Sequence, residues 1–197
     1  MIPLSIQTPN DGMNVFKALQ SPHARHGFYI MLKVNEEMMN GKRFRDYDDQ
    51  FFAVDEPADF NNYFAAYMVM CQAARLYDSG EYKKSIDTYN LLNLDKLQAY
   101  YRNSVKLDYL YYYTVHNPDY AKAKDIYAER GIKKYLNMPL PMVTRTLCAF
   151  EFFVNNDKQK AELLLENARE QADSYPNKGI RLMEKDYLSH LEKLMHA

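Results

Sequence analysis

The chain has 197 residues, and its 25 lysines and arginines against 26 aspartates and glutamates leave a net charge of −1. This balance argues against a nucleic-acid partner, because nucleic acid normally selects a strongly basic face. Hydrophobic residues make up 47% and charged residues 26%, as in a packed soluble globule, and only 6 glycines and 8 prolines favour long helices joined by short loops.

Residues 1–60 are expected to form an N-terminal segment with an extended stretch, a helix and an acidic loop. Ser21 followed by Pro22 predicts the start of the helix, and Gly41 predicts its end. Residues 12–45 contain six basic side chains against two acidic ones, whereas residues 46–60 contain six acidic side chains and no basic one. These charges either neutralise each other along the surface or place residues 12–45 near anionic lipid headgroups.

No apolar run approaches the roughly 20 residues that a membrane-spanning helix needs. The best stretch, residues 63–74, is interrupted by Gln72 and followed by Arg75. The first residues show neither the basic nor the long apolar part of a secretory signal. Cys71 and Cys148 lie in apolar contexts and make at most one disulfide, so we expect a reducing, cytoplasmic location.

Three segments repeat at an interval of 38 residues: 78–89, 116–127 and 154–165. The matching positions hold small residues in the first set and bulky ones in the second: Ser85, Ala123 and Ala161, then Tyr89, Tyr127 and Leu165. A small residue lets two helices approach closely, and a bulky residue four positions later fills the space between them. The pattern predicts repeated helix–turn–helix units, with first helices ending at Gly80, Asn117 and Asn155, residues that tolerate a left-handed backbone.

The first of these segments, Gly80-Glu-Tyr82-Lys-Lys-Ser85-Ile-Asp-Thr-Tyr89, resembles the second half of a tetratricopeptide repeat. The usual period of that family is lengthened from 34 to 38 residues here, and its expected Trp and Leu-Gly are missing. We therefore expect an all-α fold: a tetratricopeptide-like solenoid of antiparallel helix pairs over residues 61–197, closed by a C-terminal capping helix. Helices are predicted near residues 62–79, 82–93, 97–116, 119–137, 141–155, 157–173 and 178–195.

The N-terminal stretch Ile2-Pro-Leu-Ser-Ile-Gln-Thr-Pro9-Asn-Asp11-Gly12 resembles the last motif of bacterial site-2-protease-type zinc metallopeptidases. In that family the Asp ligates zinc, and some members carry a cytosolic helical tail. Asp11 matches the ligand position, but the His-Glu-x-x-His helix that binds the metal and activates water is missing from these 197 residues. The resemblance thus implies a non-catalytic C-terminal tail of such a peptidase, without metal or cofactor of its own. The alternative is a free-standing tetratricopeptide-like scaffold or peptide-sensing protein unrelated to a protease.

The tetratricopeptide resemblance also implies a concave groove, which either binds a protein or peptide segment of apolar or aromatic character or is filled by the chain's own last helix. Carried over to this sequence, its lining falls on eight residues: Tyr67, Met70, Tyr77, Asp108, Tyr112, Thr146, Phe150 and Phe153. Asp108 is the one charged side chain of this set, and it is suited to a backbone N–H or a cation. The oligomeric state stays open.

A few other side chains carry chemistry of their own. His23 and His26 are spaced to share a metal ion but are expected to be solvated, and His116 is expected to cap a helix end as a cation. Cys148 is expected in the core. Glu151 is either a partly buried carboxylate or, as we expect, reaches solvent at a helix edge. The tyrosines crowded over residues 100–113 either fill the space between helices or form a recognition surface.

Overall fold

The computed structural model describes residue 19 and residues 21–53 and 63–197. All regular elements of this described part are helical, and no strand occurs in it, which confirms the expected all-α class. The chain divides after Gln98 into two compact units. The domain boundary predicted at residues 60–61 lies outside the described residues, and so does Asp11.

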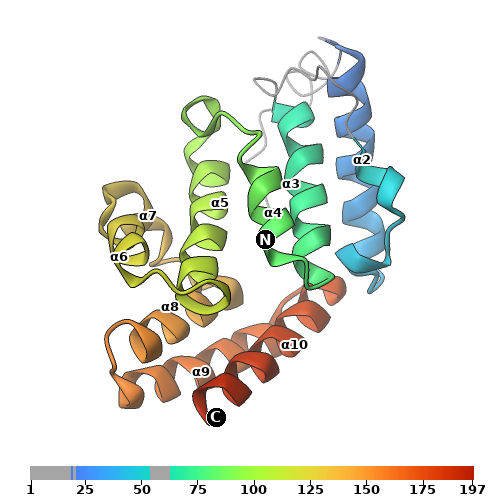
Figure 1. Cartoon of the computed structure of the whole chain (residues 1–197). Helices are drawn as coiled ribbons and strands as arrows, with labels where there is room; N and C mark the ends of the chain where they lie inside the picture. The colour runs from blue at the N-terminus through green and yellow to red at the C-terminus, as the bar shows by residue number, and fades with distance from the viewer. Residues whose placement is uncertain (1–18, 20, 54–62) are drawn as a thin grey trace. The chain divides into compact units, whose positions relative to one another are not determined.

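The unit before residue 99 is built around α3 (Tyr63–Asp78), with α2 (Pro22–Met39) and α4 (Tyr82–Tyr89) packed on it (Figure 1). The hydroxyl of Ser21 accepts a hydrogen bond from the Ala24 N–H at 3.0 Å, which confirms the predicted start of α2. Gly27 lies where α2 approaches α3, because a Cβ there would come within 1.9 Å of the Phe64 carbonyl oxygen. Only glycine permits this approach of the two backbones.

Two short 3₁₀ helices, η1 (Phe44–Asp46) and η2 (Asp49–Phe52), link α2 to α3. The buried Arg43 donates through Nη2 to Asp78 Oδ1 at 2.6 Å, and the Arg45 backbone N–H donates to Asp78 Oδ2 at 3.0 Å. Arg75 donates through Nε to the Tyr47 carbonyl at 2.9 Å. These bonds fix residues 43–47 against the C-terminal half of α3.

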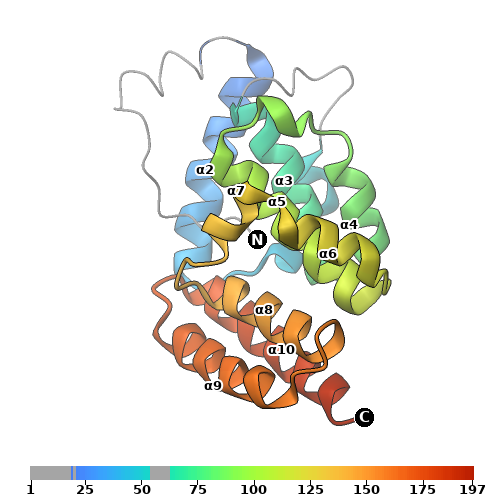
Figure 2. The same cartoon turned by 90° about the vertical axis from the view of Figure 1, so that its left-hand side faces the viewer.

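The unit from residue 99 onwards contains six α-helices in its described residues: α5 (Ala99–Tyr111), α6 (Tyr120–Ala128), α7 (Arg130–Tyr135), α8 (Pro141–Phe153), α9 (Lys158–Ser174) and α10 (Lys178–Met195). α5 continues into a π-helix, η4 (Tyr112–His116). α6 and α7 pack on α5, α9 packs on α8, and α10 lies against α8 and α9 (Figure 2).

Two predicted helices differ from the structure. The helix expected over 82–93 ends at Tyr89, and the one expected over 119–137 is two helices, because Glu129 between them is extended (φ −61°, ψ 132°). Tertiary contacts hold the break in place, since Lys106 of α5 pairs with Glu129 and the Asn103 amide donates to the Gly131 carbonyl at 3.3 Å.

The residues that recur every 38 positions are buried to a similar extent, with one exception. Ser85, Ala123 and Ala161 are fully buried, and Tyr89 and Leu165 are nearly so, whereas Tyr127 is half-buried. The Ser85 hydroxyl donates to the Ala73 carbonyl of the preceding helix at 2.7 Å. The small residues are thus buried at all three places, whereas the second bulky residue, Tyr127, is less buried than the other two.

Candidate binding pocket

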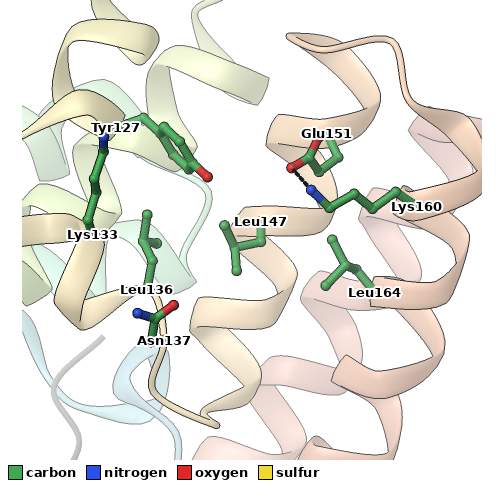
Figure 3. A pocket seen from close by; sticks show the side chains of 8 residues that line it. All are labelled: Tyr127, Lys133, Leu136, Asn137, Leu147, Glu151, Lys160 and Leu164. Carbon is green, nitrogen blue, oxygen red and sulfur yellow. Dashed lines mark hydrogen bonds and ion pairs between the residues drawn. The ribbon is translucent and has the colours of Figure 1, made fainter.

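A pocket of about 470 Å³ lies between α6 and α7 on one side and α8 and α9 on the other (Figure 3). Eight residues line it: Tyr127, Lys133, Leu136, Asn137, Leu147, Glu151, Lys160 and Leu164. All of them belong to the unit from residue 99 onwards. Its volume falls within the range of small-ligand or side-chain sites.

The break at Glu129 explains why Tyr127 lines this pocket. α6 ends one residue after Tyr127, so no further helical turn covers the ring, and α7 sets off in a new direction. The ring stacks on Phe150 of α8, with 4.4 Å between centroids and 10° between planes. Its hydroxyl points into the space beside Leu147, as Figure 3 shows. Tyr127 thus offers one apolar face to the core and a polar tip to the pocket.

Glu151 is buried, so the expectation that it reaches solvent is wrong. Its Oε1 accepts a hydrogen bond from Lys160 Nζ at 2.6 Å, and its Oε2 accepts one from Asn155 Nδ2 at 2.7 Å. The bond to Glu151 raises the pKa of Lys160. A buried carboxylate needs such partners, because an unpaired charge is costly to keep away from water.

Lys133 is exposed and forms no ion pair with any residue that the structure describes. Glu151 neutralises Lys160, so Lys133 leaves the pocket with one excess positive charge. Leu136, Leu147 and Leu164 supply apolar surface beside it. The pocket therefore suits an apolar group that lies next to a negative charge.

The eight residues expected to line a groove lie elsewhere. Asp108 and Phe153 are half-buried. The other six are buried: Tyr67, Met70, Tyr77, Tyr112, Thr146 and Phe150. The first three groove residues along the chain belong to the unit before residue 99 and the other five to the second unit. None lines the pocket, although Phe150 supports Tyr127 from behind. The groove itself stays a prediction.

Six of the eight pocket residues were not anticipated from sequence: Lys133, Leu136, Asn137, Leu147, Lys160 and Leu164. The signal that points to them is Gly131, an unfavourable residue inside the predicted helix over 119–137. A helix break near Gly131 predicts that no further helical turn covers Tyr127. The sequence alone does not indicate which other helix packs against the Tyr127 ring.

The remaining candidate residues are two histidines of α2 and one cysteine of α8. His23 is half-buried, and His26 is exposed and stacks on Tyr29 with 6.4 Å between ring centroids. Cys148 is buried as expected, and burial raises the pKa of its thiol to about 12. Within residues 21–53 and 63–197, no three His, Cys, Asp or Glu side chains are grouped to hold a metal ion.

The tyrosines over residues 100–113 are all at least partly covered. Tyr101, Tyr111 and Tyr112 are buried, and Tyr100, Tyr109 and Tyr113 are half-buried. Tyr100 packs edge-on against Tyr135 of α7, with 5.5 Å between ring centroids. This packing favours the role of space-filling between helices over that of a recognition surface.

No protein family matches the chain, and no curated protein or solved structure is significantly similar to it. Among the described helices, none is both long and apolar enough to cross a lipid bilayer.

Proposed function

We propose that this protein is a protein- or peptide-interaction module built from tetratricopeptide-like helix pairs. The helix pairs α3 with α4 and α8 with α9, and the small buried residues at 38-residue intervals, support that architecture. The pocket between α6–α7 and α8–α9 carries the functional part of the proposal, because it joins three leucines, a tyrosine tip and an unpaired lysine in one concave site.

The ligand that fits this pocket is a peptide with a leucine-sized or aromatic side chain next to an acidic residue. The apolar side chain contacts Leu136, Leu147 and Leu164, and the carboxylate lies within reach of Lys133. Burying such a side chain contributes roughly 1.5–3 kcal/mol, and a charge on the rim adds specificity more than affinity.

A set of fluorescein-labelled hexapeptides tests the proposal by fluorescence polarisation. The peptides carry Leu, Phe or Ser at the centre, next to Asp or Lys. We expect the Leu-Asp and Phe-Asp peptides to bind and the Ser-Lys peptide to fail. Leu164→Glu and Lys133→Glu in the protein should each weaken binding about tenfold, which corresponds to about 1.4 kcal/mol.

Two neighbouring side chains provide matched controls. Leu163 is exposed on α9 and Lys134 is exposed on α7, and neither lines the pocket. Leu163→Glu and Lys134→Glu should leave the affinity unchanged. If no peptide of the set binds, or if the control variants lose as much affinity as the pocket variants, the pocket is not the binding site.

We further propose that the module is the cytosolic tail of a site-2-protease-like zinc metallopeptidase. The support is the resemblance of residues 2–12, which lie outside the described residues. The open reading frame of the gene tests it, since the proposal requires upstream hydrophobic helices with a His-Glu-x-x-His motif. A gene without them favours the free-standing scaffold.

A further inference from the structure

The outer face of α2 presents a regular stripe of exposed side chains. Arg25, Tyr29, Leu32, Glu36 and Met39, which we call the α2 stripe, follow one another at alternating intervals of four and three residues. The three apolar members are half or more exposed: Tyr29 is 56%, Leu32 52% and Met39 50% accessible. The opposite face of the helix is buried and contacts α3 around Gly27.

Alternating intervals of four and three are the spacing of residues that meet along a helix–helix seam. A helix face that contacts only water gains no stability from large apolar side chains at that spacing. Isolated exposed apolar side chains are ordinary, but a row along one stripe of a helix marks an interaction surface. The α2 stripe is therefore suited to a second helix.

The two charges of the stripe indicate which helix this is. Arg25 and Glu36 form no ion pair with any residue in the described part of the chain. Lys33, a base close to Glu36, forms its ion pair with Glu37 at 3.2 Å and attracts Glu36 only at longer range. A partner helix that offers an acid opposite Arg25 and a base opposite Glu36, eleven residues apart along its seam, would complement both charges.

A second copy of α2 in antiparallel orientation meets this requirement. With the two-fold axis between residues 30 and 31, Arg25 faces Glu36 of the second copy, and Tyr29 faces its Leu32. In a parallel pair, Arg25 would face Arg25 and Glu36 would face Glu36, and such like-charge contacts are unfavourable. We propose that the protein forms a homodimer through antiparallel packing of the α2 stripe.

The length of α2 sets the strength of this dimer. Its 18 residues span about 27 Å at 1.5 Å per residue. A single helix pair of this length buries roughly 1,000 Å² in total, the lower limit for a specific interface. We therefore expect a weak dimer, with a dissociation constant of about 10–100 μM, in line with affinities at the low end of this interface class.

Sedimentation equilibrium of the full chain, with protein from about 5 to 300 μM, tests the proposal. The wild-type protein should approach a dimer at the upper end. Arg25→Glu and Glu36→Arg should each weaken the dimer tenfold or more, because each places two like-charge contacts in the seam. Circular dichroism of each variant checks that the helices are retained.

Charge exchange, taken together with the weakening expected in each single variant, tests whether residue 25 faces residue 36 across the seam. A mixture of the Arg25→Glu and Glu36→Arg proteins should form a heterodimer, since both of its contacts then join opposite charges. The double variant with both changes should dimerise like wild type. Leu182→Glu, an exposed position on α10, should change nothing.

Three results would each overturn the proposal. The first is a wild-type chain that stays monomeric at 300 μM. The second is a mixture or double variant that does not recover the dimer. The third is a monomer that binds vesicles of phosphatidylcholine and phosphatidylglycerol through Tyr29 and Leu32, because the stripe would then be a membrane-contacting surface.

Discussion

The imidazole of His116 lies in a mostly buried, aromatic environment. Its ring centroid is 5.4 Å from that of Tyr111 and 6.4 Å from that of His190, which stacks on it at 14°. Burial, with smaller contributions from the nearby charges of Arg145 and His190, lowers the pKa of His116 to about 3. His116 does lie at a helix end, that of η4, as expected. Its side chain is neutral in the folded protein at neutral pH, so the expectation of a positive charge there is wrong.

This environment predicts a pH-dependent loss of stability. An unfolded chain holds His116 with an ordinary pKa near 6.5 and so binds a proton more readily than the folded chain does. The stabilisation is fully present above about pH 6.5 and is lost as the pH falls toward 3, by at most about 1.4 kcal/mol per unit. Urea unfolding at pH 7, 6 and 5 should show a steeper loss in the wild-type protein than in His116→Gln.

The comparison between the two proteins removes the contribution of the carboxylates, because both chains share them. A difference in free energy of unfolding that stays constant from pH 7 to pH 5 would contradict the prediction. It would mean that His116 takes up a proton in the folded state as easily as in the unfolded one.

At the scale of elements, three helix ends show how one residue changes the route of the chain. Gly80, Pro118 and Asn156 occupy matching positions at 38-residue intervals. Gly80 and Asn156 adopt left-handed backbones, with φ of 84° and 55°. Pro118 is restricted to φ near −65°, and the helix before it ends instead as η4, where the Asn117 N–H donates to the Tyr112 carbonyl at 2.9 Å.

Substitutions of Gly80 therefore measure the free-energy cost of placing a residue with a Cβ in the left-handed backbone region. A Cβ at this position would meet no atom within 4 Å, so a substitution changes only the backbone energy. Gly80→Ala should lower the free energy of unfolding by about 1–2 kcal/mol, and Gly80→Asn should cost less, as Asn tolerates this region. Thermal or urea unfolding measures both, with Ser79→Ala as the neighbouring control. Equal stability of the Ala and Asn variants would refute this account.

These helix ends also show which parts of the fold could be predicted from the sequence. Gly80 was predicted correctly, but the left-handed residues expected at Asn117 and Asn155 were not: Asn117 has φ −142°, and Asn156 takes the place of Asn155. The repeat period and the helix-capping residues can be identified in the sequence itself, and they predicted the ends of most helices to within a few residues. The break at Glu129 depends on Lys106 and Asn103 of another helix, and the pocket depends on that break, so neither follows from local pattern.

At the scale of the whole molecule, each compact unit contains a buried ion pair of its own. Arg43 and Asp78 join the η1 link to α3, and both side chains are at most 8% accessible. Arg145 of α8 donates through Nε to Glu184 of α10 at 2.9 Å, and these side chains are at most 3% accessible. The Arg145 guanidinium also lies over the Tyr111 ring, at 4.2 Å from its centroid.

These two pairs allow a matched test of whether the units unfold separately. Removing one charge of a buried pair leaves the other uncompensated and costs about 3–5 kcal/mol. Hydrogen exchange of the full chain, read by mass spectrometry, should show faster exchange within α3 and α4 in Asp78→Asn, with α8–α10 still protected. Glu184→Gln should show the reverse, because local unfolding follows the contacts of each core. Faster exchange throughout the chain in both variants would instead show that residues on the two sides of Gln98 unfold as one cooperative body.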